Sequence, residues 1–267
     1  MGSTFGSELS VAEKAASEAG KIIKENFGRV AAGYKEDRTV ITETDTQCEE
    51  IIKSRLLDGF PEYSFLGEET GRIERGERVW VVDPLDGTMN FFMGNPLCCV
   101  AIALVENGEP LIGVTFAPIL DETFSAAKGE GATLNGLEMH VSRKTDISRS
   151  VVSLAHLKDD DSIDNVLRFY GELKEAKART RQYGTGCLEA AFVASGRLDA
   201  WVDLGKKGFI PSPWDTAGGA LLVKEAGGRA TNYEGKEYRV FSPTGYVATN
   251  GTIHDVLLGL VNRAVIK

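Results

Sequence analysis

The run Val79-Trp80-Val81-Val82 constrains the fold more than any other segment of this chain. Consecutive apolar residues, most of them β-branched, are typical of a strand that is buried on both faces of its sheet. We therefore expect this strand to lie inside a sheet rather than at its edge. Pro84 fixes φ and lacks an N–H donor, and we therefore expect the strand to end there.

Two carboxylates follow this strand, in Asp83-Pro84-Leu85-Asp86-Gly87-Thr88. Ligands of open α/β sheets bind at the carboxyl ends of strands, and two carboxylates placed there repel each other unless a cation lies between them. Hard oxygen ligands suit Mg²⁺ or Mn²⁺. If Gly87-Thr88 begins a helix, its backbone N–H groups face an anion. The alternative is a turn in which the aspartates only cap a helix.

Two further acidic segments lie on either side of the Asp83 strand in the sequence. Gly67-Glu68-Glu69-Thr70 follows a short predicted strand, and on its own it also fits a solvated loop. Because it lies shortly before the Asp83 strand, both pairs of acids can meet at one sheet edge and supply four carboxylates. Asp215, in Pro213-Trp214-Asp215-Thr216-Ala217-Gly218-Gly219, begins a helix rich in small residues, where it is either a helix cap or another ligand.

The remaining hydrophobic periodicity predicts two lobes that act as one catalytic unit. Residues 1–142 form an α+β lobe that carries most of the acidic segments, and residues 143–267 form an α/β lobe that carries Asp215. Segment 33–41 is predicted to be a polar loop or a short hairpin. Helices are expected at 7–27, 46–57, 161–170, 188–194, 216–226 and 253–261, and strands at 64–66, 79–82, 100–105, 111–116, 122–127, 150–155, 198–202 and 246–249.

Charge excludes several classes of partner. The chain has 267 residues, with 30 Lys+Arg against 39 Asp+Glu and a net charge of −9. This acidic surplus argues against binding to a nucleic acid polymer, which depends on basic side chains, and against docking on an anionic membrane. An anionic substrate remains compatible if a local cation reverses the sign of the charge.

Histidine and cysteine usage excludes other chemistry. The chain has 3 histidines and 4 cysteines, and the cysteines form no C-x-x-C pair. A multi-histidine zinc site and thioredoxin-like chemistry therefore lose support. The simplest interpretation is a reduced chain with small hydrophobic thiols. No apolar run reaches the roughly 18 residues of a membrane span, and the N-terminus does not resemble a signal peptide, so we expect a cytoplasmic protein.

Together these segments resemble the inositol monophosphatase family, within the superfamily of Mg²⁺-dependent, Li⁺-inhibited phosphomonoesterases that includes fructose-1,6-bisphosphatase. The resemblance implies an α/β (α+β) fold, a layered αβαβα sandwich. It extends over nearly the whole chain. The matching segments are Thr42-Glu43-Thr44-Asp45, Gly67-Glu68-Glu69, Asp83-Pro84-Leu85-Asp86-Gly87-Thr88, Trp214-Asp215-Thr216-Ala217, Glu225-Ala226-Gly227-Gly228 and Ala248-Thr249-Asn250.

The resemblance implies a metal-binding role for five of the matching residues. Glu68, Asp83 and the carbonyl of Leu85 would hold a first Mg²⁺. Asp83, Asp86 and Asp215 would hold a second, and Glu68 would share a weaker third. Mn²⁺ would be an alternative ion, and Li⁺ an inhibitor.

The resemblance also implies catalytic roles beside the metals. Thr88, paired with Asp45, would orient the attacking water and help to deprotonate it, and Glu69 would support that site. The phosphate would lie between the metals and the N–H groups of Gly87 and Thr88, in contact with Asp86. In-line attack by water needs no covalent intermediate and no histidine, which suits a chain with 3 histidines.

Substrate recognition is where the sequence departs from inositol-specific relatives. By resemblance, Gly184-Thr185-Gly186 lines the hydroxyls of the substrate, although a helix-entry turn explains it equally well. Those relatives carry an acidic residue shortly before the W-D motif, whereas this chain has Lys206 and Lys207, and its nearest acid is Asp203. The lysines favour a second phosphate or another anion, unless they form only a solvated basic turn. Lys35 is the candidate for the lysine of the family's mobile loop.

The sequence therefore predicts a Mg²⁺-dependent phosphomonoesterase for a small phosphorylated polyol, with inositol monophosphate as the first candidate. Alternative substrates are fructose 1,6-bisphosphate, both compounds together, or another small metabolite such as histidinol phosphate or a nucleotide 3′-phosphate. A different class of function is an inactive, metal-binding regulatory relative. Because family members are usually homodimers, we expect a homodimer.

Overall fold

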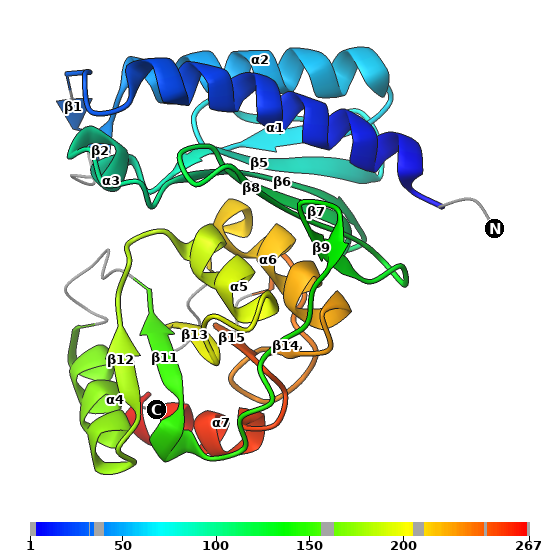
Figure 1. Cartoon of the computed structure of the whole chain (residues 1–267). Helices are drawn as coiled ribbons and strands as arrows, with labels where there is room; N and C mark the ends of the chain where they lie inside the picture. The colour runs from blue at the N-terminus through cyan, green and yellow to red at the C-terminus, as the bar shows by residue number, and fades with distance from the viewer. Residues whose placement is uncertain are drawn as a thin grey trace.

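The computed structural model describes residues 4–31, 33–34, 40–155, 163–204, 211–242 and 245–265. Five layers follow one another through the molecule (Figure 1). Two helices cover an eight-stranded sheet, two more lie between this sheet and a five-stranded sheet, and two cover the outer face of the smaller sheet, which confirms the predicted αβαβα sandwich. In layer order the helices are α1 (Gly6–Asn26) and α2 (Glu43–Gly59), α5 (Gly186–Ala194) and α6 (Pro213–Glu225), and α4 (Ile163–Glu175) and α7 (His254–Ala264).

The large sheet brings two strand ends together at one edge. Its strand order is β10-β9-β8-β7-β6-β5-β3-β4, and β3 and β5 are parallel while the other neighbours are antiparallel. The strands are β3 (Ser64–Gly67), β4 (Gly71–Ile73), β5 (Arg78–Asp86), β6 (Cys99–Glu106), β7 (Glu109–Ala117), β8 (Glu122–Ala127), β9 (Ala132–Leu134) and β10 (Leu137–Glu138).

The small sheet has the order β12-β11-β13-β15-β14 and mixes parallel and antiparallel pairs. Its strands are β11 (Val151–Leu154), β12 (Arg179–Arg181), β13 (Ala200–Asp203), β14 (Arg229–Thr231) and β15 (Tyr246–Thr249). The remaining elements are the short hairpin β1 (Gly33–Tyr34) and β2 (Val40–Ile41), helix α3 (Thr88–Phe92) and the 3₁₀ turn η1 (Ile147–Arg149).

The apolar run at residues 79–82 of β5 is buried on both faces of the sheet, as predicted. Val79 and Val81 join the core shared with α5 and α6, whereas Trp80 and Val82 join the core beneath α1 and α2. Alternate side chains of a strand point to opposite faces, so β5 packs into both cores. This packing on both faces fixes the position of the carboxyl end of β5.

Some predicted boundaries were wrong for local reasons. The strand does not end at Pro84 but runs to Asp86, with a shift of register between Asp83 and Asp86 that leaves no ladder N–H for Pro84 to supply. Helix α2 starts at Glu43 rather than at residue 46, because Thr42 and Asp45 form a capping box. No helix within the described ranges has both the length and the apolar character that a membrane span needs.

Candidate functional site

The parallel pairing of β3 with β5 places two acidic segments side by side. Gly67 lies opposite Val82 in this register, and the N–H of Glu68 donates to the carbonyl of Val82 over 3.2 Å. Glu68 therefore leaves the sheet at the same edge as Asp83, the next residue of β5. The positions of Glu68 and Asp83 were predicted from the sequence, because each lies at or just after the end of a buried strand.

Asp83 lies among other carboxylates. Its side chain is 2% exposed, and one of its oxygens accepts the N–H of Leu85 at 3.0 Å. Burial raises the pKa of Asp83 well above its ordinary value, and the negative charges of Glu68, Asp86 and Asp215 raise it further. Acids from the turn after β3, from β5 and from the first turn of α6 therefore lie near one another, although they come from three separate stretches of chain.

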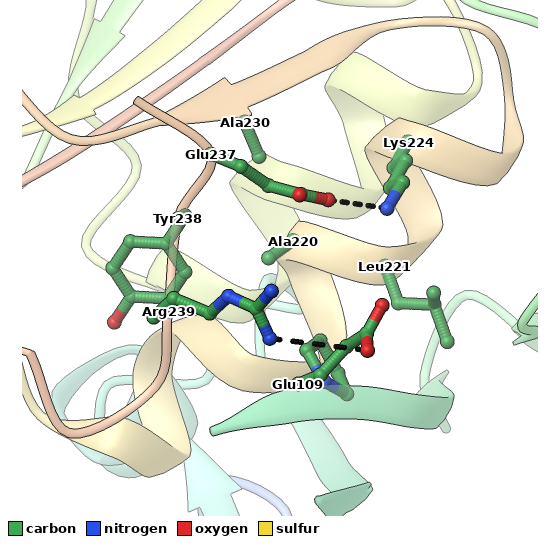
Figure 2. Close-up of a pocket in the computed structure, with 9 residues that line it drawn as sticks. Glu109, Ala220, Leu221, Lys224, Ala230, Glu237, Tyr238 and Arg239 are labelled. Atoms are coloured by element: carbon green, nitrogen blue, oxygen red, sulfur yellow. Dashed lines mark hydrogen bonds and ion pairs between the residues drawn. The ribbon is translucent and has the colours of Figure 1, made fainter. Parts of the chain in front are cut away.

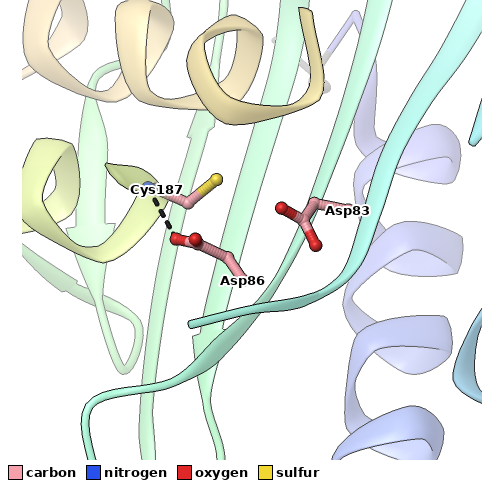
Figure 3. Close-up of side chains that lie close together, drawn as sticks. All are labelled: Asp83, Asp86 and Cys187. Atoms are coloured by element: carbon pink, nitrogen blue, oxygen red, sulfur yellow. Dashed lines mark hydrogen bonds between the residues drawn. The ribbon is translucent and has the colours of Figure 1, made fainter. Parts of the chain in front are cut away.

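Asp86 joins this acidic group to the C-terminal half of the chain. Its Oδ2 accepts a hydrogen bond from the hydroxyl of Thr185 at 2.7 Å and another from the N–H of Cys187 at 2.8 Å. Figure 3 shows the second bond, with Asp83 on the other side of Asp86 from the start of α5. Carboxylate oxygens of Asp83 and Asp86 and the sulfur of Cys187 lie within 4.8 Å of one another.

Thr88 and Asp45 form a hydrogen-bonded pair, as the resemblance implies. The hydroxyl of Thr88 lies 3.0 Å from Oδ1 of Asp45 and 3.0 Å from the carbonyl of Leu85. The other oxygen of Asp45 accepts the N–H and the hydroxyl of Thr42, at 2.8 and 2.6 Å. Burial raises the pKa of Asp45, the hydrogen bonds from Thr42 and Thr88 oppose that rise, and the nearby charge of Glu69 adds to it.

The turn between Asp86 and Thr88 requires glycine. Gly87 has φ +82°, and a Cβ there would lie 2.8 Å from the carbonyl oxygen of Leu97. This left-handed residue is the N-cap of the short helix α3. The predicted helix start at Thr88 is therefore present.

The loop before α5 is held by side chains that the sequence analysis did not identify. Nδ2 of Asn90 donates to the carbonyl of Tyr183 at 2.7 Å, and Oε1 of Glu189 accepts the N–H of Tyr183 at 2.6 Å and the hydroxyl of Ser153 at 2.8 Å. Gly184 is exposed, whereas Thr185 is buried with its hydroxyl on Asp86. Glu189 lies in the first turn of α5, six residues after Tyr183, and an acid in the first turn of a predicted helix was the available signal.

The described residues of the site include neither the predicted lysines nor the lining of the pocket in Figure 2. Lys35, Lys206 and Lys207 lie outside the described residues. The pocket in Figure 2 lies between α6, the start of β7 and the segment after β14, and none of its lining residues is a predicted site residue. An ion pair of Arg239 with Glu109, 3.8 Å long, crosses it. Its volume of about 20 Å³ is room for about one water molecule, too little for a substrate.

The donor set at the sheet edge fits a hard divalent cation. Oxygens of Asp83 and Asp86 lie within reach of one ion, and Glu68 and Asp215 are close enough for their charges to act on Asp83; carboxylate oxygens are ligands that Mg²⁺ and Mn²⁺ prefer. Mutual repulsion among the acids falls when a cation binds between them. The site is therefore suited to metal-assisted chemistry on an anionic substrate.

Known proteins and solved structures resemble this chain over nearly its whole length. The model of the inositol monophosphatase family matches residues 7–265. The fructose-1,6-bisphosphatase/inositol-1-monophosphatase of Thermotoga maritima is 35% identical over 253 residues, 93% of each chain. Inositol monophosphatase 3 of Solanum lycopersicum is 37% identical over 263 residues, 96% of each chain. Among solved structures, the extragenic suppressor protein suhB of Bartonella henselae is similar with a TM-score of 0.88 and 30% identity, over 96% of this chain and 99% of that one.

Proposed function

Because this chain belongs to the inositol monophosphatase family, we propose that it hydrolyses a small phosphorylated polyol, inositol monophosphate first, in a reaction that depends on Mg²⁺. The family predicted from the sequence is confirmed, and with it the enzyme class, a phosphoric monoester hydrolase. The observation that carries the proposal is the convergence of Glu68, Asp86 and Asp215 around the buried Asp83.

The acids would serve as metal ligands. Glu68, Asp83 and the carbonyl of Leu85 would hold one Mg²⁺, and Asp83, Asp86 and Asp215 a second. When bound, these ions would lower the pKa of a water molecule and neutralise the oxygens of the phosphate. Two hydrogen bonds support this assignment by holding Leu85 beside the acids: its N–H donates to Asp83, and its carbonyl lies 3.0 Å from the hydroxyl of Thr88.

Thr88 and Asp45 would handle the proton of the attacking water. When the Thr88 hydroxyl donates to Asp45, the lone pairs of its oxygen accept a hydrogen bond from a water molecule. Asp45 is buried and its pKa is raised, so it accepts a proton more readily than an exposed aspartate does. Glu69 lies close enough to Asp45 for its charge to contribute to that shift.

The substrate would lie between the two lobes. We propose that residues 1–142 and 143–267 act as one catalytic unit, because Asp86 of the first half binds both Thr185 and Cys187 of the second. The phosphate would face Gly87 and Thr88, and the polyol would face the exposed backbone of Gly184 and the half-buried Gly186. Lys206 and Lys207 are proposed to contact a second anionic group where a substrate carries one.

A phosphate-release panel tests the proposal. Inositol 1-phosphate, fructose 1,6-bisphosphate and histidinol phosphate are offered at equal concentration, with Mg²⁺ and with a chelator. We expect Mg²⁺-dependent release with the highest kcat/KM for inositol 1-phosphate. Preference for fructose 1,6-bisphosphate would instead match the double activity in the name of the Thermotoga maritima relative. No release from any compound in Mg²⁺, by a folded protein, would favour a regulatory relative.

Three finer properties belong to the same proposal. We propose a homodimer, inhibition by Li⁺ and a cytoplasmic location. The 4 cysteines lie buried as free thiols, which supports a reducing compartment. Light scattering of the purified chain tests the dimer, and addition of LiCl to the phosphate-release assay tests the inhibition.

A further inference from the structure

Helix α2 carries two buried carboxylates on one face. Asp45 and Glu49 are separated by four residues, the spacing that stacks side chains one turn apart on a helix. Asp45 binds Thr88, as described above, whereas Glu49 has no part in the proposed chemistry. Its side chain is 0% exposed, and a carboxylate is retained in such a place only when hydrogen bonds compensate its burial.

Glu49 uses both of its oxygens on the turn that carries Glu68. Oε2 accepts the N–H of Glu69 at 2.8 Å, and Oε1 accepts the N–H of Thr70 at 2.7 Å. The N–H of Glu68 itself donates to Val82 on β5. Three consecutive amides of the turn are therefore held, one by the sheet and two by helix α2.

Gly67 makes room for this arrangement. A Cβ on Gly67 would lie 2.4 Å from Oε2 of Glu49 and 2.5 Å from its carboxyl carbon. Any side chain at this position would displace the carboxylate from the turn. The glycine before the two glutamates is thus explained by Glu49.

We propose that Glu49 is a positioning residue for the metal site: it fixes the Glu68-Glu69-Thr70 turn so that Glu68 faces Asp83. The same helix holds Thr88 through Asp45, so α2 sets the metal ligand and the water-orienting hydroxyl in one frame. The inference rests on the proposed metal-dependent function. Residues that orient metal ligands typically change metal affinity about 10–100-fold when they are replaced.

The test is a direct measurement of Mn²⁺ binding in the absence of substrate. The electron paramagnetic resonance signal of free Mn²⁺ reports how much of the ion remains unbound. In Glu49→Gln, one oxygen becomes an NH₂ donor that faces a backbone N–H donor, so one bond is lost and the turn is repelled. We expect Glu49→Gln to bind Mn²⁺ about 10-fold more weakly than the wild type. Glu50→Gln, on the exposed face of the same helix, is the matched control and should bind like the wild type.

The outcomes separate the two proposals. If folded Glu49→Gln binds Mn²⁺ with wild-type affinity, the positioning role is overturned. Replacing a residue that only stabilises the fold lowers the melting temperature but does not change the Mn²⁺ affinity of the folded molecules. If the wild type itself binds no Mn²⁺, the proposed metal site fails and the role of Glu49 fails with it. If Glu49→Gln does not fold, Gly67→Ala decides, since it keeps the charge and displaces the carboxylate. Weakened binding in Gly67→Ala supports the proposal, and unchanged binding rejects it.

Discussion

The two sides of the candidate site hold their side chains by different means. On the side that carries the proposed metal ligands (the metal side), the parallel register of β3 and β5 sets Glu68 beside Asp83, and the acids lie close enough for their charges to raise the pKa of Asp83. In the loop before α5, backbone groups of Tyr183 are held by the side chains of Asn90 and Glu189. The metal side therefore depends on negative charge, whereas the loop depends on hydrogen-bond geometry.

The largest expected effect is on the metal side. We expect Asp215→Asn to lower kcat/KM about 10³-fold in saturating Mg²⁺, because an amide neither supplies the charge of a carboxylate nor binds a hard cation as strongly. The measurement is phosphate release from inositol 1-phosphate, with circular dichroism to verify the fold. Asp58→Asn, an exposed carboxylate on α2, should retain wild-type turnover. Full activity in both variants would remove Asp215 from the site.

The second effect concerns Glu189, the buried carboxyl on α5 that supports the loop, and not the proposed metal ligands. Burial, assisted by the charges of Asp86 and Asp203, raises the pKa of Glu189 to about 8 from an ordinary value of 4.5. Between these two values the folded chain binds a proton at Glu189 that the unfolded chain has lost, so stability falls as pH rises. Glu189→Gln cannot ionise, and its one amide oxygen can accept both bonds that Oε1 of Glu189 now accepts.

Urea unfolding of the metal-free wild type and Glu189→Gln tests that difference. Between about pH 5 and about pH 7 we expect the free energy of unfolding of the wild type to fall by about 2–3 kcal/mol relative to the variant. Parallel pH dependences in the two proteins would show that Glu189 ionises in the folded state as it does in the unfolded chain. In that case the loop would resemble the metal side in its dependence on charge.

The same contrast explains how far the sequence could be read. Asp83 and Asp86 lie at the end of an unmistakable buried strand, and Glu68 follows its parallel neighbour, so a meeting of these three acids was predictable from local patterns. The support that Asn90 gives the loop was not, because Asn90 and Tyr183 are 93 residues apart and meet only in the folded chain. Glu49 was missed for the same reason, since its partners are 20 and 21 residues away.

Two element boundaries were predicted wrongly because the local hydrogen bonding is irregular there. Asp45 was predicted to lie before its helix, yet its carboxylate closes the capping box with Thr42, and Asp45 therefore belongs to the first turn. Pro84 was expected to end a strand, yet the irregular pairing between Asp83 and Asp86 accommodates a residue without an N–H. Neither compensation is visible in hydrophobic periodicity.

The smallest expected effect lies where the two sides meet, at Thr185. Valine has nearly the shape of threonine but lacks the hydroxyl, so Thr185→Val removes the 2.7 Å bond to Asp86 and leaves the bond from the N–H of Cys187. A hydrogen bond to a charged group contributes about 1.5–3 kcal/mol. Since the N–H of Cys187 and the thiol of Cys99 still donate to Asp86, we expect kcat/KM to fall about 10-fold, near the lower limit of that range. Thr180→Val is the matched control and should retain wild-type kinetics, because Thr180 lies on the edge strand β12 and its hydroxyl donates to that of Tyr170 on α4. A loss as large as that of Asp215→Asn would place Thr185 within the metal side, and no loss in the folded variant would mean that Asp86 works independently of the loop.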